Sequence, residues 1–314
     1  MSTDQDRQED RPLAPGLYLV ATPIGNLEDI TLRALRVLRS VDKIACEDTR
    51  QTQKLLNHFD IRTPTVSYHM HNEAGRAAEL AVELRAGARI AVVSDAGTPG
   101  IADPGGQIAL AAIAAGVPVF PIPGANAAIS ALIASGLAGT GPAGNGESFS
   151  FHGFLPAKEG QRRTALEALR QSRVPHLPPL GHGNDAATTQ IFYEAPHRIL
   201  DALADVQAIF GATQYVVVAR ELTKLHEEFL RGTVSEVRKT LADRASVRGE
   251  IVLLFAPAPA ETAREGKPLS IAAEVRELMK TQGLDEKDAL KQVARARNMG
   301  KSEAYRELQR ERGR

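Results

Sequence analysis

Five short strand-like segments in the first half of the chain alternate with segments of helical periodicity. The strands are predicted at Leu17–Ala21, Lys43–Cys46, Thr65–Tyr68, Ile90–Val93 and Val117–Ile122. Strands that alternate with helices along a chain form a mostly parallel sheet, and the helices cover both of its faces. The pattern therefore predicts an α/β domain.

A polar or glycine-rich turn follows each of these strands. The turns read TPIGN, CEDTR, YHMHNE, SDAGTPG and PGANA. The carboxyl ends of parallel strands share one edge of the sheet, so the turns are expected to meet at one crevice where a ligand binds. Any one of them, taken alone, could also be an ordinary connection between a strand and a helix, and their convergence is the stronger indication.

The longest of these motifs is VVSDAGTPGIADPGG, from Val92 to Gly106. Its glycines let a ligand approach the backbone, and Asp95 or Asp103 can accept hydrogen bonds from hydroxyl groups. Asp103 and Pro104 are predicted to cap and start the next helix. The chain lacks both the G-x-G-x-x-G spacing and the G-x-x-x-x-G-K-[ST] motif, so the glycines suit a ligand such as an adenosyl group better than a pyrophosphate.

A second domain is predicted after the linker-like run GLAGTGPAGNG, with the two α/β domains at 15–138 and 147–258. Its strands are expected at Phe149–Phe154, Ile191–Tyr193, Tyr215–Ala219 and Glu250–Phe255, with a helix at Arg162–Leu169. Gln171–Thr189 is rich in proline and glycine, and is interpreted as a surface loop.

The two ends of the chain differ from the middle in composition. Residues 1–14 are polar and charged, which predicts a disordered leader rather than a signal peptide, and no later stretch has the apolar length of a membrane span. Helices are predicted at Ile271–Lys280, Lys287–Ala296 and Ser302–Arg312. Residues 264–314 hold 13 Lys and Arg against 9 Asp and Glu. A helix-turn-helix-like domain at 267–314 fits this pattern, as does a charged tail or a dimer contact.

The bulk composition excludes some classes of protein. Lys and Arg together number 38, as do Asp and Glu, so net charge argues neither for nor against a nucleic-acid partner. Cys46 is the single cysteine, which excludes a disulfide framework and suits the reducing cytoplasm.

Candidate catalytic side chains follow the second and third strands. Glu47 or Asp48 could act as a general base and Arg50 could bind a phosphate; alternatively, they form a salt bridge that caps the next helix. His69, His71 and Glu73 are candidate bases or metal ligands, but no third ligand accompanies the two histidines, so no metal site is predicted.

Candidate substrate-binding cations lie at strand ends of the second domain. Arg198, Arg220, Lys224 and His226 could hold an anionic substrate. The alternative is that they pair with the neighbouring glutamates, which are Glu194, Glu221, Glu227 and Glu228.

Taken together, these motifs resemble the ribosomal RNA small subunit methyltransferase I family of the tetrapyrrole methylase superfamily. The runs that carry the resemblance lie between Leu17 and Pro257, in the order LYLVATPIGNLEDITLRAL, CEDTR, VVSDAGTPGIADPG, PIPGANAAISAL, FYEAPHR and VARELTKLHEE. Lys267–Arg314 resembles the small helix-turn-helix domain that many members carry. Met70 stands where members often have an acidic residue, so no catalytic role is assigned there.

The resemblance implies a fold, a methyl donor and a substrate. The fold is two α/β domains with S-adenosylmethionine in the cleft between them, usually in a homodimer. The substrate is the 2′-hydroxyl of cytidine 1402 in 16S ribosomal RNA, free or in the small subunit, which implies a cytoplasmic enzyme. The residues expected to contact the donor are Pro23, Asp95, Gly97, Gly100, Ile101, Asn126, Ala127, Tyr193, Glu194 and, closing the adenine side, Ala256.

Removing the hydroxyl proton calls for a base, and the candidates are Glu47, Asp48 and His69, in that order. Arg50 and Arg198 are the expected phosphate anchors, with Arg220 and Lys224 as further substrate contacts. Two other functions remain open: methylation of a tetrapyrrole or a protein side chain on the same fold, and a non-catalytic role as an RNA-binding assembly factor.

Overall fold

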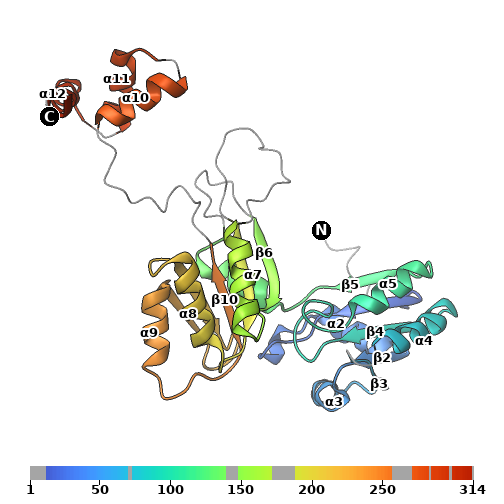
Figure 1. Ribbon diagram of the computed structural model, residues 1–314. Coiled ribbons are helices and arrows are strands. Elements are labelled where there is room, and N and C mark those ends of the chain that lie inside the picture. Colours follow the sequence, from blue (N-terminus) through green and yellow to red (C-terminus); the bar gives the residue numbers. More distant parts are fainter. Residues whose placement is uncertain are drawn as a thin grey trace. The chain divides into compact units, whose positions relative to one another are not determined.

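The computed structural model describes residues 12–69, 73–138, 148–171, 188–256, 271–282, 284–296 and 299–312 (Figure 1). The chain forms two compact units, Met1–Pro257 and Ala258–Arg314. The predicted domain at 15–138 and all but the last residue of the one at 147–258 fall within the first unit. In the described part of the chain, no helix is both long and apolar enough to cross a membrane.

The first sheet is parallel throughout, which confirms the predicted α/β architecture. Its strands lie in the order β3-β2-β4-β1-β5 and each pairs in parallel with its neighbours. They are β1 (Gly16–Val20), β2 (Lys43–Cys46), β3 (Thr65–Ser67), β4 (Arg89–Val93) and β5 (Val119–Ile122).

Helices cover both faces of this sheet because successive strand residues point to opposite sides. Tyr18 and Ile44 pack with α2 (Leu32–Ser40) and α3 (Thr49–His58) on one face. Leu17 and Ile90 pack with α4 (Glu73–Arg85) and α5 (Gly106–Ala114) on the other face. A short 3-10 helix, η1 (Leu27–Asp29), precedes α2.

The start of α5 differs from the prediction that Asp103 and Pro104 begin this helix. The helix begins at Gly106, after an N-cap glycine, Gly105, that has no capping side chain. Ala102 has a left-handed φ of 63°, and the Gly100 N–H donates to the Pro104 carbonyl at 3.1 Å, so residues 100–104 form a separate turn.

Side chains from an earlier segment cap α5 instead. The Glu73 carboxylate accepts hydrogen bonds from the N–H groups of Gly105 and Gln107, and the Tyr68 hydroxyl accepts one from the Ile108 N–H. The prediction of an Asp103 cap was wrong because the groups that satisfy this helix come from a segment thirty residues earlier in the chain.

The second sheet is mixed, with order β6-β7-β10-β8-β9. Strand β10 is at its centre and runs antiparallel to both β7 and β8, whereas β6 is parallel to β7 and β9 is antiparallel to β8. The strands are β6 (Phe149–Phe154), β7 (Thr189–Glu194), β8 (Tyr215–Arg220), β9 (Glu228–Thr233) and β10 (Ile251–Phe255). The sequence did not predict β9, whose residues EFLRGT lack an apolar run.

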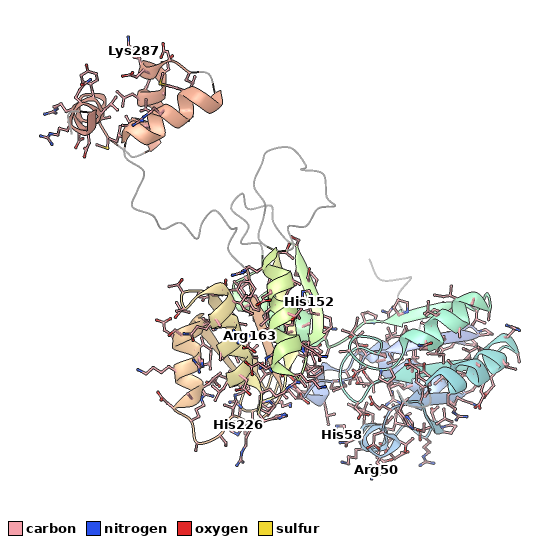
Figure 2. The ribbon with its side chains drawn as sticks, viewed as in Figure 1. Arg50, His58, His152, Arg163, His226 and Lys287 are labelled. Carbon is pink, nitrogen blue, oxygen red and sulfur yellow. The ribbon has the colours of Figure 1, made fainter. Side chains whose placement is uncertain are left out.

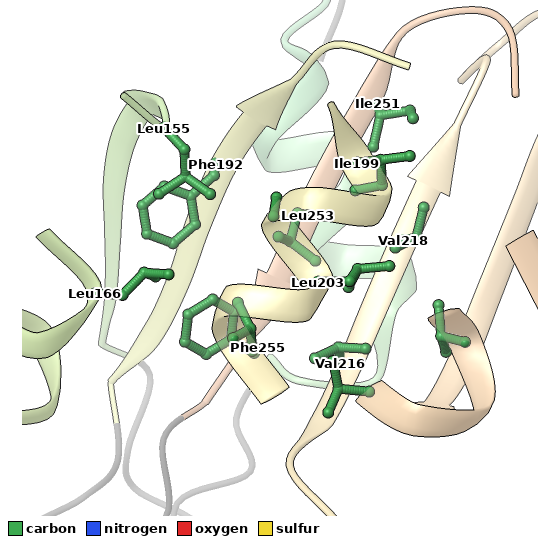
Figure 3. Close-up of a cluster of buried hydrophobic side chains, with 14 of the residues drawn as sticks. Leu155, Leu166, Phe192, Ile199, Leu203, Val216, Val218, Ile251, Leu253 and Phe255 are labelled. Atoms are coloured by element: carbon green, nitrogen blue, oxygen red, sulfur yellow. The ribbon is translucent and has the colours of Figure 1, made fainter. Parts of the chain in front are cut away.

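Three helices cover one face of the second sheet (Figure 1): α7 (Glu159–Gln171), α8 (Ile199–Phe210) and α9 (Val234–Ala242). Figure 3 shows Ile199 and Leu203 of α8 against Phe192, Val218 and Leu253 of the sheet. The intervening residues, including Val217 and Val252, belong to a separate cluster on the opposite face.

Helix α6 (Ala127–Ser135) covers that opposite face and connects the two sheets. It follows β5 of the first sheet, yet Ala128, Ala131 and Leu132 pack against the second sheet. Arg231 of β9 donates to the carbonyls of Ala134 and Ser135 at 2.6 and 3.2 Å, which satisfies the carboxyl end of α6.

The second unit contains α10 (Ile271–Gln282), α11 (Glu286–Ala296) and α12 (Lys301–Arg312). They surround a core that includes Ile271, Val275, Ala289, Val293 and Leu308. The three predicted helices are confirmed, and their likeness to a helix-turn-helix stays a prediction.

Several predicted segments lie outside the described residues. These are residues 1–11 of the leader, residues 139–147 at the predicted domain boundary and residues 172–187 of the predicted surface loop. Gln171 closes α7, and Thr189 opens β7.

Candidate active site

The turns after β1 and β4 form one continuous surface. Thr22 and Gly97 exchange two backbone hydrogen bonds: the Thr22 N–H donates to Gly97 at 2.8 Å, and the Gly97 N–H donates back at 3.0 Å. Gly97 has a φ of 83°, a conformation that favours glycine. We call residues 22–26 the first turn and residues 94–100 the glycine turn.

The turn after β5 joins the same surface. The Thr98 hydroxyl donates to the Ala125 carbonyl at 3.1 Å, and the Asn126 side-chain amide donates to that hydroxyl at 3.4 Å. Asn126 also caps α6 by accepting from the Ile129 N–H. Because β4, β1 and β5 are neighbours in the sheet, the structure brings together the predicted donor contacts at Pro23, Gly97, Asn126 and Ala127.

Gly100 and Ile101 lie at the end of the glycine turn. Gly100 has a left-handed φ of 83°, and Ile101 donates its N–H to the Thr98 carbonyl. Ile101 is partly exposed, so its apolar side chain is available to a ligand at this edge.

Asp95 connects the glycine turn to the turn after β2. One of its carboxylate oxygens accepts the Asp48 N–H at 3.1 Å. Asp48 in turn caps α3 by accepting the Arg50 N–H at 2.8 Å, and it forms an ion pair with the Arg50 guanidinium at 3.2 Å. Hydrogen bonds from Arg50 hold the pKa of Asp48 below its ordinary value. This is the helix-capping salt bridge described above as the alternative to catalysis.

The pKa values of Glu47 and Asp103 are shifted in the opposite direction from that of Asp48. Burial raises the pKa of Glu47, and the negative charge of Asp95 adds to the shift while His69 opposes it. Burial and the charge of Glu47 raise the pKa of Asp103 to about 6, against a hydrogen bond with Ser94. Asp103 was noted in the sequence as a hydrogen-bond acceptor but was missing from the catalytic candidates.

The candidate bases and metal ligands after β3 are His69, His71 and Glu73. Met70 and His71 lie outside the described residues. The Glu73 carboxylate accepts hydrogen bonds from the Tyr68 hydroxyl and from the backbone at the start of α5, which gives it a structural role. Among the described residues, no group of three or more His, Cys, Asp or Glu side chains could hold a metal ion.

Tyr193 and Glu194 end β7 on the second sheet. The Tyr193 ring packs edge-on against Phe151, at 4.9 Å between centroids. Burial raises the pKa of Tyr193, and the negative charge of Asp103 adds to the shift. The Glu194 side chain is fully buried and pairs with Arg198 at 2.6 Å.

The remaining predicted substrate cations also have acidic partners. Arg220 pairs with Glu228 at 3.0 Å and donates to the backbone carbonyls of His226 and Arg248. Lys224 lies between Glu221 and Glu250, at 2.8 and 3.1 Å. Arg198, Arg220 and Lys224 therefore form ion pairs with glutamates, as the alternative interpretation of the sequence proposed. Their contact with a substrate stays a prediction. By contrast, the Arg50 side chain is 88% exposed and extends into solvent (Figure 2).

Ala256 is the one predicted donor contact that the structure separates from the others. Because β10 is antiparallel to β7, Ile251 pairs with Glu194, while Phe255 pairs with Gln190 at the opposite end. The Ala256 carbonyl accepts from the Gln214 side chain there. A strand of this length spans roughly 13 Å, so it is Glu250, before β10, that lies at the Tyr193 edge. Strand direction was not readable from the sequence.

Comparisons with known proteins agree with this architecture. Residues 16–238 match the family described as Tetrapyrrole (Corrin/Porphyrin) Methylases. Among solved structures, uroporphyrin-III-C-methyltransferase of Thermus thermophilus is similar in fold, with a TM-score of 0.51 and 20% identity over 77% of this chain and 94% of that one. A diphthine synthase is similar to the same degree, with a TM-score of 0.52 and 14% identity over 76% of this chain and 89% of the other.

Closer relatives are similar over nearly their whole length. The ribosomal RNA small subunit methyltransferase I of Halalkalibacterium halodurans is 46% identical over 308 residues, which cover 97% of this chain and 98% of the relative. The protein of that name from Bacillus subtilis is 42% identical over 92% of each chain. The chain therefore belongs to the tetrapyrrole methylase family and, within it, to the ribosomal RNA small subunit methyltransferase I proteins.

Proposed function

We propose that this methyltransferase transfers a methyl group from S-adenosylmethionine to the 2′-hydroxyl of cytidine 1402 in 16S ribosomal RNA. Family membership makes the chain a methyltransferase, and the names of its relatives support ribosomal RNA of the small subunit as the substrate. The observation that carries the proposal is the joined surface of three turns, with Glu47, Asp95 and Asp103 beside it.

The residues at this edge fit the donor chemically. S-adenosylmethionine carries a positive sulfonium and ribose hydroxyls, and the edge offers carboxylates that attract a cation and accept hydrogen bonds. A Cβ at Gly97 would lie 3.2 Å from an Ile24 methyl group, so the backbone here is open only because the residue is glycine. Pro23, Gly97, Asn126 and Ala127 would hold the donor, which supplies an electrophilic methyl group that already carries its leaving group.

The protonation states favour Glu47 and Asp103 over Asp48 as the base. A general base works best when its pKa lies near the working pH. Burial raises the pKa of Glu47 and brings that of Asp103 to about 6, whereas Arg50 holds the pKa of Asp48 low. We propose that one of these two partly buried carboxylates accepts the ribose proton while the turns align the hydroxyl oxygen with the methyl group.

Two surfaces are suited to RNA. The exposed Arg50 lines a hollow of about 430 Å³ together with Gln53, Lys54 and Asn57, all groups that bind phosphate or base edges. In the second unit, Ala304 and Leu308 of α12 are buried, so Arg306 and Arg310 lie on the opposite, exposed side of the helix.

Mapping the methyl group tests the proposal directly. We would incubate the protein with labelled S-adenosylmethionine and either naked 16S rRNA or whole small subunits, and then locate the label. Label on the ribose of cytidine 1402 is expected. Label on a protein of the small subunit, or label only on a tetrapyrrole in a parallel incubation that contains one, would support the second candidate function. No affinity for S-adenosylmethionine by calorimetry would support an assembly factor.

We also propose a homodimer in the cytoplasm, where the proposed substrate is found. Ile129 and Ile133 lie one turn apart on α6 and are both exposed, and Leu110 and Ile113 are exposed on α5. Apolar residues in such positions are typical of surfaces that associate. Sedimentation equilibrium should give the mass of two chains, and a mass of one chain would contradict the dimer.

A further inference from the structure

We propose that Lys224 is a positioning residue for donor binding, because its side chain, held by two glutamates of the second domain, fixes the conformation of the first turn. The inference rests on the proposed function in one respect, namely that S-adenosylmethionine binds at this turn. It gives Lys224 a different role from the substrate contact predicted from the sequence.

The contact between Lys224 and the first turn is unusually close. A Cβ at Gly25 would overlap Cγ of Lys224, lie 2.9 Å from its Cε and lie 3.0 Å from the Thr223 hydroxyl oxygen. Gly25 is not among the residues with a left-handed φ. Its backbone therefore suits any residue, and the position requires glycine because the lysine stem occupies the space.

The lysine cannot readily move aside. Its Nζ donates to Glu221 at 2.8 Å and to Glu250 at 3.1 Å, and only 28% of the side chain is exposed. Burial acts to lower the pKa of Lys224, but the hydrogen bonds to Glu221 and Glu250 outweigh it and leave the pKa raised. An ammonium whose charge is already balanced by two carboxylates has little attraction left for a phosphate. The same two hydrogen bonds fix the end of the lysine side chain and so hold its methylene groups in place.

The loop that carries Lys224 is itself constrained. Glu221 and Thr223 have left-handed φ values of 53° and 65°, which non-glycine residues adopt only where the surroundings hold them. Glu221 also accepts the Glu250 N–H at 3.1 Å, and a Cβ at Gly249 would overlap its carboxyl group. The Thr223 N–H donates to Glu227 at 2.7 Å.

The first turn links the position of the Lys224 side chain to the rest of the site. Ile24, next to Gly25, is buried in the cluster between α6 and the second sheet, and Thr22 is hydrogen-bonded to Gly97. Only Ile24 separates Gly25 from Pro23, so a shift of Gly25 displaces Ile24 and with it Pro23, while Thr22 stays bonded to Gly97. The second domain thus sets the shape of a turn that belongs to the first.

A double-mutant cycle tests the inference. Four variants of the full chain would be compared: Gly25→Ala, Lys224→Ala, Gly25→Ala with Lys224→Ala, and Gly25→Ala with Lys224→Met. Gly25→Ala should weaken S-adenosylmethionine binding by calorimetry about tenfold. Lys224→Ala alone should also weaken donor binding, because the first turn loses its support, and Gly25→Ala should cost little more in that background because Cγ is gone. Gly25→Ala with Lys224→Met, which keeps the stem and removes the charge, should bind no better than Gly25→Ala alone.

Controls separate positioning from folding and from the proposed function. Gly75→Ala adds a Cβ in open space on α4, so it should leave donor affinity unchanged and, because alanine favours the helix over glycine, should not lower the unfolding midpoint. Normal donor affinity in Gly25→Ala, or losses that simply add in the double variant, would overturn the role of Lys224. Absence of donor binding in the unsubstituted protein would instead refute the proposed function.

Discussion

At the residue scale, neighbouring carboxylates at one sheet edge differ because their partners differ. Asp48 is the N-cap of α3 and accepts hydrogen bonds from Arg50, which lower the pKa of its carboxyl group. Glu47, the preceding residue, is partly buried among other acids, which raises its pKa. Two adjacent acids in the sequence thus have different chemistry, and the sequence alone ranked them only by their place after a strand.

Substitution of these two acids should separate catalysis from capping. Glu47→Gln should lower single-turnover methylation of small subunits by about 10²–10⁴-fold if Glu47 is the base, with little change in donor affinity. Asp48→Asn should have a small effect, because asparagine caps helices as well as aspartate does. Equal losses in the two variants would contradict this ranking.

The raised pKa of Asp103 predicts that the free energy of unfolding decreases as the pH rises. Its pKa of about 6 in the folded chain exceeds the ordinary 3.8, so the folded state holds the proton more tightly than the unfolded state. This contribution to stability is complete below pH 3.8 and is lost as the pH rises through about 6. Asp103→Asn should therefore be more stable than the unsubstituted protein by about 1–2 kcal/mol at pH 8.

Urea unfolding at several pH values measures this difference, which should shrink to nothing below pH 4. Asp48→Asn is the matched control, because its pKa is lowered and its pH dependence should have the opposite sign. A stability difference that is the same at all pH values would show that the substitution acts through packing rather than charge.

At the scale of elements, the sequence predicted strands well and the connections between them less well. The strands of the first sheet were found because most of them are short apolar runs between turn residues, although β3, with residues TVS, is only partly buried. The predicted start of α5 was wrong because Glu73 and Tyr68 supply its cap from a distance, and β9 was missed because its two apolar residues do not form a longer apolar run. Ala256 was misplaced relative to Tyr193 because pairing, not sequence, sets the direction of β10.

The packing of α7 on α8 depends on a buried ion pair that can be tested. Arg162 and Asp205 are 2.7 Å apart, and less than a tenth of either side chain is exposed. Asp205→Ala leaves a buried guanidinium without its carboxylate and should lower the free energy of unfolding by about 3 kcal/mol. Glu159→Ala breaks an exposed pair with Arg163 on the same helix and should cost at most about 0.5 kcal/mol, measured in urea.

At the scale of the whole molecule, Ala258–Arg314 is a separate unit with a core of its own. We therefore expect this unit to contribute to RNA binding and the first unit to bind the donor. Arg306→Glu with Arg310→Glu should weaken binding to small subunits at least about tenfold and reduce its dependence on salt, because fewer phosphates are neutralised. Donor affinity should not change.

Arg276→Glu is a control for this pair, since Arg276 is an exposed arginine of α10 in the same unit. Filter binding at two salt concentrations measures the effect. An equal loss in the control would show that the unit contributes only general charge, and no loss in either would remove the second unit from the RNA contact.

The place of β10 has a consequence for synthesis of the chain. Of the strands that the structure describes it is the last to be translated, yet it lies at the centre of the second sheet, between β7 and β8. Until it emerges from the exit tunnel, both of those strands present open edges that can pair with another nascent chain. A premature stop codon before Glu250 would therefore not trim the domain from one side. It would leave two half-sheets prone to aggregation, and Lys224 would lose one of the two carboxylates that hold it.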